Sequence, residues 1–500
     1  MKYQALTLLR TLDREEFSKF KLFVSSPYFT KKKNLLVLIE VLAKFHPHFE
    51  NNQLTYKYLK SKLNNVNNST LRNYFSDLKD LLIKYLMHIN LENNKQEQYI
   101  VTMEELENRN LINLYKKEKL KYVKHINNPN LEFKPDDYFY LYRFNLIEKN
   151  ILVNTDCIKK GKNYQISEVE IKIENYLSKY YLLESLKSWI QCKMHHRYFN
   201  MKIDEPHVSM NTFFREGKEI DCLFENIINE ERDNKRKRVL ETYFLIYQCY
   251  KENTNTEDLY KSLQSLLETI MSLPCNVEGY EYQYILSVSR NAYFELRIKN
   301  VYETNLKSKF DLLYLESYLR HGGDPSIPNF SFSAILLESL LDFNLEFAQN
   351  IFKKYQKYSS SLFETFHENC IKFLEHFINQ NFTGASEVYL KLKTKDINTK
   401  RRLKLLQIYL QYEMGNYDYC ITLSENFKKF IHNHKNEHSR VHIEHINNIC
   451  NVFKLLCNIR INFNKDKLIE LERMEFPLTI FLQKKRQEIL KEYKVKYRNF

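Results

Sequence analysis

Apolar residues recur along most of the chain at intervals of three and four, the spacing that places them on one face of an α-helix. Near the start, Asp13 and Glu16 have the spacing of a helix-capping pair and open the first long periodic segment. Four such segments follow one another: 11–24, 35–45, 54–63 and 69–86. This pattern predicts a helical N-terminal module over residues 1–90.

Few residues interrupt the helical pattern, because the 500 positions hold only 7 glycines and 9 prolines. Doubly wound α/β folds and β-sandwiches need frequent turns, and phosphate-binding loops need clustered glycines. An apolar share of 43% is nevertheless enough to bury a core. We therefore predict an all-α fold, divided into units or extended as an array, since single cores stop growing near about 250–300 residues.

The C-terminal third of the chain repeats. Three small residues align at spacings of 37 and 35: Ala348, Ala385 and Cys420. An asparagine lies four positions before each of them: Asn344, Asn381 and Asn416. Five further columns are apolar in all three units: Leu336, Phe373 and Ile408; Leu337, Leu374 and Tyr409; Leu340, Phe377 and Tyr412; Ile351, Val388 and Leu423; and Tyr355, Leu392 and Phe427.

These columns predict a helical hairpin in each unit. The columns before the asparagine form the face of a first helix, and those from the small residue onward form the face of a second. We expect the asparagine to end the first helix in the left-handed C-cap conformation, which asparagine tolerates. The Ala or Cys allows the two helix backbones to approach closely. Because neither helix buries its apolar face alone, neighbouring hairpins must stack.

The segment "YLQYEMGNYDYCITLSENF" (409–427) resembles the helix-turn-helix of a tetratricopeptide repeat, with Gly415, Asn416 and Tyr417 at its turn. The period is also close to that family's ~34 residues. The likeness covers about residues 333–432 and lacks the family's opening Trp, mid-helix Gly and closing Pro. It implies a tetratricopeptide-like α-solenoid with a protein- or peptide-binding surface and no catalysis.

Three regions follow from these patterns. A basic helical module over 1–90 precedes irregular helical hairpins over 91–330, which continue the array. Residues 331–500 hold the tetratricopeptide-like repeats and the terminal capping helices.

The net charge of +14 is concentrated at the N-terminus, where residues 1–90 hold 15 Lys and Arg against 7 Asp and Glu, a net of +8. Thr30 is expected to cap a helix whose first turn is Lys31, Lys32 and Lys33. Free amide N–H groups and three ammonium groups would bind an anion there, although cations oppose the helix dipole at an N-terminus. The interpretation we favour is a packing helix with a solvated basic start.

Segments 54–63 and 69–86 resemble a helix-turn-helix DNA-binding unit. In that role the second segment would direct Arg72 and Asn73 toward base edges. Three lysines of the first segment would contact phosphates: Lys57, Lys60 and Lys62. Asp77 and Asp80 would face the polyanion, and the five-residue turn is long for this motif, so structural packing is the interpretation we favour.

Chemical signatures are sparse. His438, His442 and His445 have the i, i+4, i+7 spacing of a weak Zn²⁺ or Ni²⁺ candidate, but a solvated basic face is the interpretation we favour. GxSxG, P-loop, GxGxxG and HExxH motifs are absent. We expect no catalytic residues, no metal and no other cofactor. Nine cysteines without a CxxC pair, no signal peptide and no spanning segment predict a soluble cytoplasmic protein without a membrane partner.

The function expected from these features is a non-enzymatic protein–protein interaction scaffold or adaptor that binds a partner segment on its helical-repeat surface. The alternative is a DNA-binding or transcriptional regulatory protein. It would use the basic N-terminal module on nucleic acid and the helical array as sensor or assembly arm. The partner's identity and the oligomeric state stay open.

Overall fold

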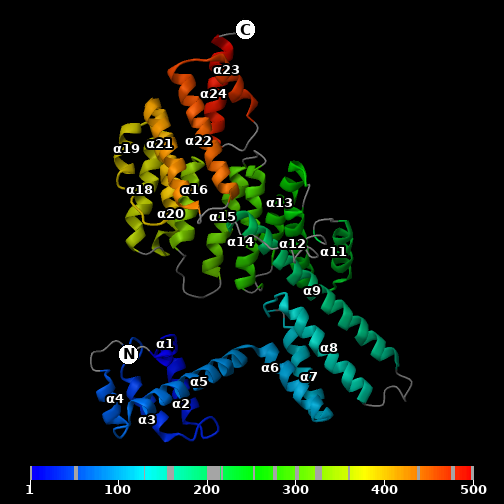
Figure 1. The fold of residues 1–500 in the computed structure, drawn as a ribbon. Helices are drawn as coiled ribbons and strands as arrows, with labels where there is room; N and C mark the ends of the chain where they lie inside the picture. Colours follow the sequence, from blue (N-terminus) through cyan, green and yellow to red (C-terminus); the bar gives the residue numbers. More distant parts are fainter. Residues whose placement is uncertain are drawn as a thin grey trace. The chain divides into compact units, whose positions relative to one another are not determined.

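The computed structural model describes residues 3–49, 54–128, 130–154, 163–199, 214, 218–251, 254–273, 277, 279–298, 303–320, 329–358, 361–435, 440–474 and 479–496. Within them, 23 α-helices and one short 3-10 helix (Gln356–Tyr358) form all the regular structure apart from a parallel bridge between Phe133 and Val277. Most helices that are consecutive in sequence pack against each other (Figure 1). The predicted all-α fold with an array of helical hairpins is confirmed.

The chain forms two units: Met1–Asn128 with Tyr140–Glu174, and Pro129–Phe139 with Asn175–Phe500. Helices α8 (Asp136–Asn154) and α9 (Asn163–Phe199) contribute to both. The other helices of the first unit are α1 (Gln4–Leu9), α2 (Arg14–Ser25), α3 (Lys33–Ala43), α4 (Tyr56–Lys62), α5 (Asn68–Asn93), α6 (Lys95–Asn108) and α7 (Ile112–Ile126). The boundary predicted at residue 90 lies inside α5.

The second unit holds most of the helices. They are α11 (Lys218–Glu230), α12 (Asn234–Tyr250), α13 (Thr256–Met271), α14 (Gly279–Ile298), α15 (Thr304–Arg320), α16 (Asn329–Leu341), α17 (Leu345–Tyr355), α18 (Ser361–Ile378), α19 (Phe382–Tyr389), α20 (Ile397–Glu413), α21 (Tyr417–Asn433), α22 (Arg440–Ile461), α23 (Lys465–Arg473) and α24 (Ile480–Lys496).

The N-terminal segment encloses a core of its own between α1, α2, α3 and α5. The capping pair predicted at the start of α2 is present. The Asp13 carboxylate accepts a hydrogen bond from the Glu16 backbone N–H at 2.8 Å, and the Glu16 carboxylate accepts one from the Asp13 N–H at 3.0 Å. On α5, the Tyr85 hydroxyl donates to the Glu16 carbonyl at 2.7 Å, which ties the longest helix of this segment to the start of α2.

A second core of the first unit lies between α6, α7 and α8, where Tyr115 and Tyr122 are buried. Arg143 on α8 lies 2.8 Å from the carboxylates of both Glu97 and Glu104 on α6. This unit therefore contains two apolar cores, which α5 connects.

The apolar columns of the repeats form the core of the C-terminal part of the second unit. Every side chain in the five columns is buried except Leu423, which is half-buried. The Tyr409 ring stacks on Phe481 of α24 with ring centroids 4.2 Å apart, so the last helix closes this core. The Asn464 side chain caps α23 by accepting hydrogen bonds from the backbone N–H groups of Asp466 and Lys467, at 2.7 and 3.2 Å.

Among the described residues, no helix has both the length and the apolar composition needed to cross a membrane.

Candidate functional site

The three repeat hairpins share one turn geometry. The residue before each asparagine has a positive φ angle, 55° at Phe343, 58° at Gln380 and 77° at Gly415. The asparagine N–H then bonds to the carbonyl five residues earlier, at 2.9 to 3.0 Å, which completes a Schellman end of the first helix. The expectation that asparagine adopts the left-handed conformation is therefore wrong, since the three asparagines have φ angles of −92°, −84° and −81°.

The asparagines begin the second helix instead of ending the first. The side chains of Asn344 and Asn381 each accept a hydrogen bond from the backbone N–H three residues later, at 3.1 and 3.0 Å. Asn416 occupies the same N-cap position, but its amide donates to the Gln411 side chain at 2.8 Å. Asparagine serves here as an N-cap, one of its preferred roles.

The small residues of the repeat lie where the two helices of each hairpin meet. Ala348, Ala385 and Cys420 are each 0% exposed. The Cys420 thiol lies 3.7 Å from the carbonyl oxygen of Ile408 in the first helix of its hairpin. Close-packed interiors leave no room there for a larger side chain. The three small residues therefore let the helices of each hairpin pack closely, and the three asparagines form the turns between them.

The lysines of the predicted anion site are all exposed, but the helix begins later than expected. Helix α3 starts at Lys33 with Lys32 as its N-cap, and Lys31 precedes both. The prediction that Thr30 caps this helix is wrong, because the N-cap is Lys32. Thr30 lies instead in the preceding turn, where the Ser26 carbonyl accepts hydrogen bonds from the N–H groups of Phe29 and Thr30 at 3.1 and 3.3 Å. The Thr30 hydroxyl accepts from the Lys32 N–H at 3.1 Å within that turn.

The start of α3 is fastened to the N-terminal half of α5. The Lys32 ammonium lies 2.5 Å from the Asp77 carboxylate, and the Asn34 amide donates to the Tyr74 hydroxyl at 2.6 Å. Asp77, which counted against DNA binding in the sequence, therefore neutralises Lys32.

Arg72 and Asn73 are exposed on the face of α5 that points away from its buried residues. On α4, Lys57 and Lys62 are exposed and Lys60 is half-buried. Helices α4 and α5 thus present exposed basic and amide side chains, as the predicted DNA-binding role requires. Helix α4 is only seven residues long, however, and α5 packs across α1, α2 and α3. DNA recognition by this pair stays a prediction.

The N-terminus of the chain links α4 to α5. The Tyr3 ring stacks on Phe75 of α5 with centroids 3.9 Å apart and lies 6.1 Å from the ring of Tyr56 at the start of α4. Helix α4 and the start of α3 are therefore both attached to the N-terminal half of α5.

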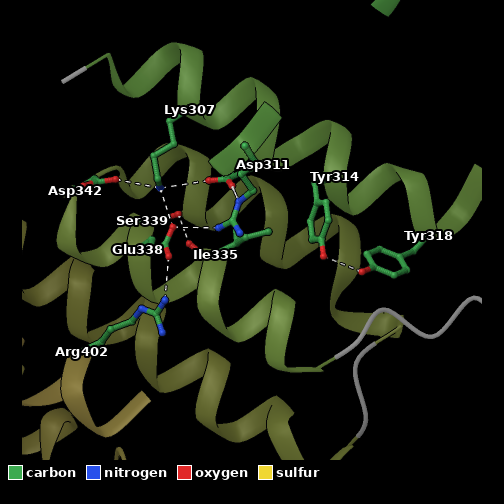
Figure 2. Close-up of polar contacts among 10 residues, drawn as sticks. Lys307, Asp311, Tyr314, Tyr318, Ile335, Glu338, Ser339, Asp342 and Arg402 are labelled. Atoms are coloured by element: carbon green, nitrogen blue, oxygen red, sulfur yellow. Dashed lines mark hydrogen bonds and ion pairs between the residues drawn. The ribbon is translucent and has the colours of Figure 1, made fainter. Parts of the chain in front are cut away.

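A cluster of six charged side chains that the sequence did not reveal lies between α14, α15, α16 and α20 (Figure 2): Arg290, Lys307, Asp311, Glu338, Asp342 and Arg402. Glu338 is its centre, with carboxylate oxygens 2.9 Å from Arg402, 3.1 Å from Arg290 and 3.5 Å from Lys307. Lys307 also reaches Asp342 at 3.1 Å. We refer to these six residues as the charge cluster.

The charge cluster is balanced, with three cations and three carboxylates. Burial alone would lower the pKa of Arg290, but the carboxylates of Asp311 and Glu338 more than offset it and hold that pKa above its usual range. Buried charges are tolerated when they are paired and hydrogen-bonded. The cluster therefore fastens four helices in one arrangement. A sequence signal for it exists in "SAILLESLL" (333–341), where Glu338 interrupts an apolar run.

A serine and a histidine face each other between α16 and α18. The Ser333 hydroxyl oxygen lies 2.7 Å from Nε2 of His367, and the two residues are 4% and 0% exposed. Burial lowers the pKa of His367 from 6.5 to about 4. A serine nucleophile needs both a histidine base and access for its substrate. Because these groups are buried, they suit packing better than catalysis.

The candidate metal histidines are only partly described. His438 and the side chain of His442 lie outside the described residues, and His445 is half-buried on α22. Among the side chains that the structure does describe, no group of three His, Cys, Asp or Glu is arranged to hold a metal ion. The solvated face expected for these histidines stays a prediction.

None of the known protein-family models, curated proteins or solved structures matches the chain. The architecture of packed neighbouring helix pairs is compatible with a helical-repeat solenoid. The function must therefore be inferred from the side chains that this architecture leaves on the surface.

Proposed function

We propose that this protein is a non-enzymatic interaction scaffold whose tetratricopeptide-like array presents partner-binding side chains in fixed positions. The observation that carries the proposal is an aromatic and apolar patch at the surface of α19 and α21, formed by one half-buried and two exposed side chains. A surface that is ordered before binding loses little conformational entropy when a partner docks. The repeat columns and the charge cluster supply that order.

The patch consists of Tyr389, Leu390 and Tyr419. Leu390 is 70% exposed and Tyr419 is 49% exposed. The half-buried Tyr389 donates to the Gln407 side chain at 3.4 Å. Burial raises the pKa of Tyr389 to about 12, and the neighbouring Tyr419 adds to the shift, so the two phenols lie close together. Tyrosines combine a large apolar ring with a hydroxyl and are enriched at binding surfaces.

A photo-cross-linking side chain at position 419 tests the scaffold. We expect one discrete cross-linked protein in the native cell, and we expect it to disappear when Leu390→Asp is introduced into the same chain. The matched control is the same photo-cross-linker at Tyr280, which is 79% exposed on α14. Equal products from positions 419 and 280, or none from either, would contradict the proposal.

A second candidate function is nucleic-acid binding by the N-terminal module. The observation that favours it is that three basic residues of the N-terminal module, Lys31, Lys33 and Arg72, are exposed and take part in no ion pair within the described residues. Lysine and arginine that neutralise phosphates release counterions, so binding depends strongly on salt. Lys32 is left out of this group because Asp77 already pairs with it.

Fluorescence anisotropy with labelled random-sequence duplex and single-stranded oligonucleotides, across a salt series, tests this candidate. The triple variant Lys31→Glu, Lys33→Glu and Arg72→Glu should lose at least about tenfold in affinity. Its salt slope should fall by about 3, since each lost phosphate contact removes about 0.9. These losses should appear with both forms of oligonucleotide if phosphates alone are recognised.

The control carries the same change in charge on another face of the same unit: Lys116→Glu, Lys117→Glu and Lys124→Glu on α7, where all three lysines are exposed. An equal loss in both triple variants would show that net charge alone is responsible and would remove the assignment to the N-terminal module. Absence of binding at low salt would remove the function itself.

A further inference from the structure

The C-terminal half of α5 is apolar on two opposite faces. Its inner face carries Leu82 and Tyr85, which are buried in the N-terminal core. Its outer face carries four large apolar side chains that are exposed by 46%, 36%, 68% and 37%: Ile83, Leu86, Met87 and Leu91. We call these four residues the outer stripe. Figure 1 shows that α5 leads from the α1–α4 group to α6 as one long helix.

The outer stripe has the spacing of an interface. Its positions are i, i+3, i+4 and i+8, which lie on one side of an α-helix over more than two turns. Single exposed apolar residues are common on protein surfaces, whereas a contiguous group marks a contact site. A helix that is apolar all round is normally covered on every side. We therefore expect the outer stripe to be covered by a binding partner.

The stripe is complementary to itself. Met87 is its most exposed member, and Ile83 and Leu91 each lie four residues from it. If two copies of α5 cross antiparallel about a two-fold axis at Met87, Ile83 of one copy meets Leu91 of the other. The same surface then serves on both copies, which is the property of a two-fold symmetric dimer.

Charges at the rim favour this antiparallel pairing over the parallel one. Lys84 flanks the N-terminal end of the stripe, and the exposed Glu92 lies at its C-terminal end, where its carboxylate is 3.2 Å from Nε2 of the exposed His88. Antiparallel copies bring Lys84 of one helix to the end of the other helix that carries Glu92. Parallel copies keep the two Lys84 side chains at one end and the two Glu92 side chains at the other, so this attraction between opposite charges is lost.

We propose that this protein forms a dimer through antiparallel pairing of the outer stripes of α5 in two copies of the chain. The dimer does not depend on either function proposed above. It would place two copies of the Arg72 and Asn73 surface in one particle, and two linked binding sites raise the overall affinity for any partner that engages both.

Engineered disulfides test the geometry. In a background where Cys157, Cys222 and Cys275 are replaced by Ser, Met87→Cys should form a covalent dimer under mild oxidation because the two positions meet at the axis. Ile83→Cys alone should not, since the two copies of residue 83 would lie about 12 Å apart along the helices, beyond disulfide reach. A mixture of Ile83→Cys and Leu91→Cys chains should form the mixed dimer.

Sedimentation equilibrium of the full chain under reducing conditions tests the association itself. The unmodified chain should show a concentration-dependent dimer, and Met87→Asp should weaken it at least tenfold. The control is Leu22→Asp, at a residue that is 72% exposed on α2 and lies outside the stripe. Circular dichroism establishes that both variants keep their helices.

Three results would overturn the proposal. One is a monomer up to about 100 µM, well above the micromolar affinities of weak specific interfaces, which would assign the stripe to another protein. Another is a dimer that Met87→Asp leaves unchanged. The third is equally efficient cross-linking of Ile83→Cys and Met87→Cys chains, which would indicate parallel pairing or random collision.

Discussion

Replacing Glu338 by Gln will lower the free energy of unfolding by about 3–5 kcal/mol, the range for breaking a buried ion-pair network by removal of one partner. Gln keeps the size of the side chain but removes the charge. Arg290, Lys307 and Arg402 would then share two carboxylates inside the protein. Urea denaturation followed by circular dichroism measures the loss.

The matched control is Glu368→Gln on α18, in the same unit. The Glu368 carboxylate is exposed and lies 3.9 Å from Lys372, so its loss should change stability by less than about 0.5 kcal/mol. A double variant that adds Arg402→Met to Glu338→Gln should be destabilised by less than the sum of the two single changes, because the residues are directly coupled. Equal effects of Glu338→Gln and Glu368→Gln would contradict the role of the charge cluster.

The apolar columns could be predicted from the sequence because burial leaves a periodic record. Leu336, Phe373 and Ile408 recur at nearly constant spacing, and all three are buried. The conformation of the turn between the two helices of each hairpin was harder to predict. Phe343 and Gln380 adopt positive φ angles that their side chains disfavour, and only Gly415 among the three announces that conformation. The hydrogen bonds that close the first helix outweigh residue preference there.

A fourth hairpin of the same design was not visible in the sequence. The turn between α6 and α7 has Asn110 at a φ of 57°, and the Leu111 N–H bonds to the carbonyl five residues earlier at 2.8 Å. Leu111 takes the place that asparagine holds in the repeats, and Tyr115 takes the place of the small residue. The geometry of the turn is kept while the residue types that mark it are lost.

The charged and polar groups could be placed only by the structure. Periodicity locates Glu338 on α16, but its partners come from three other helices, which no local pattern connects. The same holds for Lys32 and Asp77, 45 residues apart. The outer stripe of α5 was not recognised in the sequence, because the predicted segment ended at residue 86, whereas α5 continues to Asn93 and includes Met87 and Leu91.

Acidification from pH 7 to pH 5 will destabilise the protein by about 2 kcal/mol through His367 alone. In the folded chain, burial lowers the pKa of His367 to about 4, whereas the unfolded chain has the ordinary value of 6.5. Between these values the unfolded state binds more protons than the folded state. Stability therefore falls as the pH drops below about 6.5 and levels off near pH 4.

The variant His367→Gln isolates this contribution, because Gln retains a hydrogen-bonding group for Ser333 and does not titrate. Urea denaturation at pH 7 and pH 5 should show a loss on acidification that is about 2 kcal/mol smaller in the variant than in the unmodified chain. His432→Gln, at an exposed position on α21, should leave the loss unchanged. If His367→Gln and the unmodified chain lose equal stability on acidification, then the imidazole takes up its proton without unfolding. The Ser333 hydroxyl would then lie beside a positively charged His367 inside the folded array.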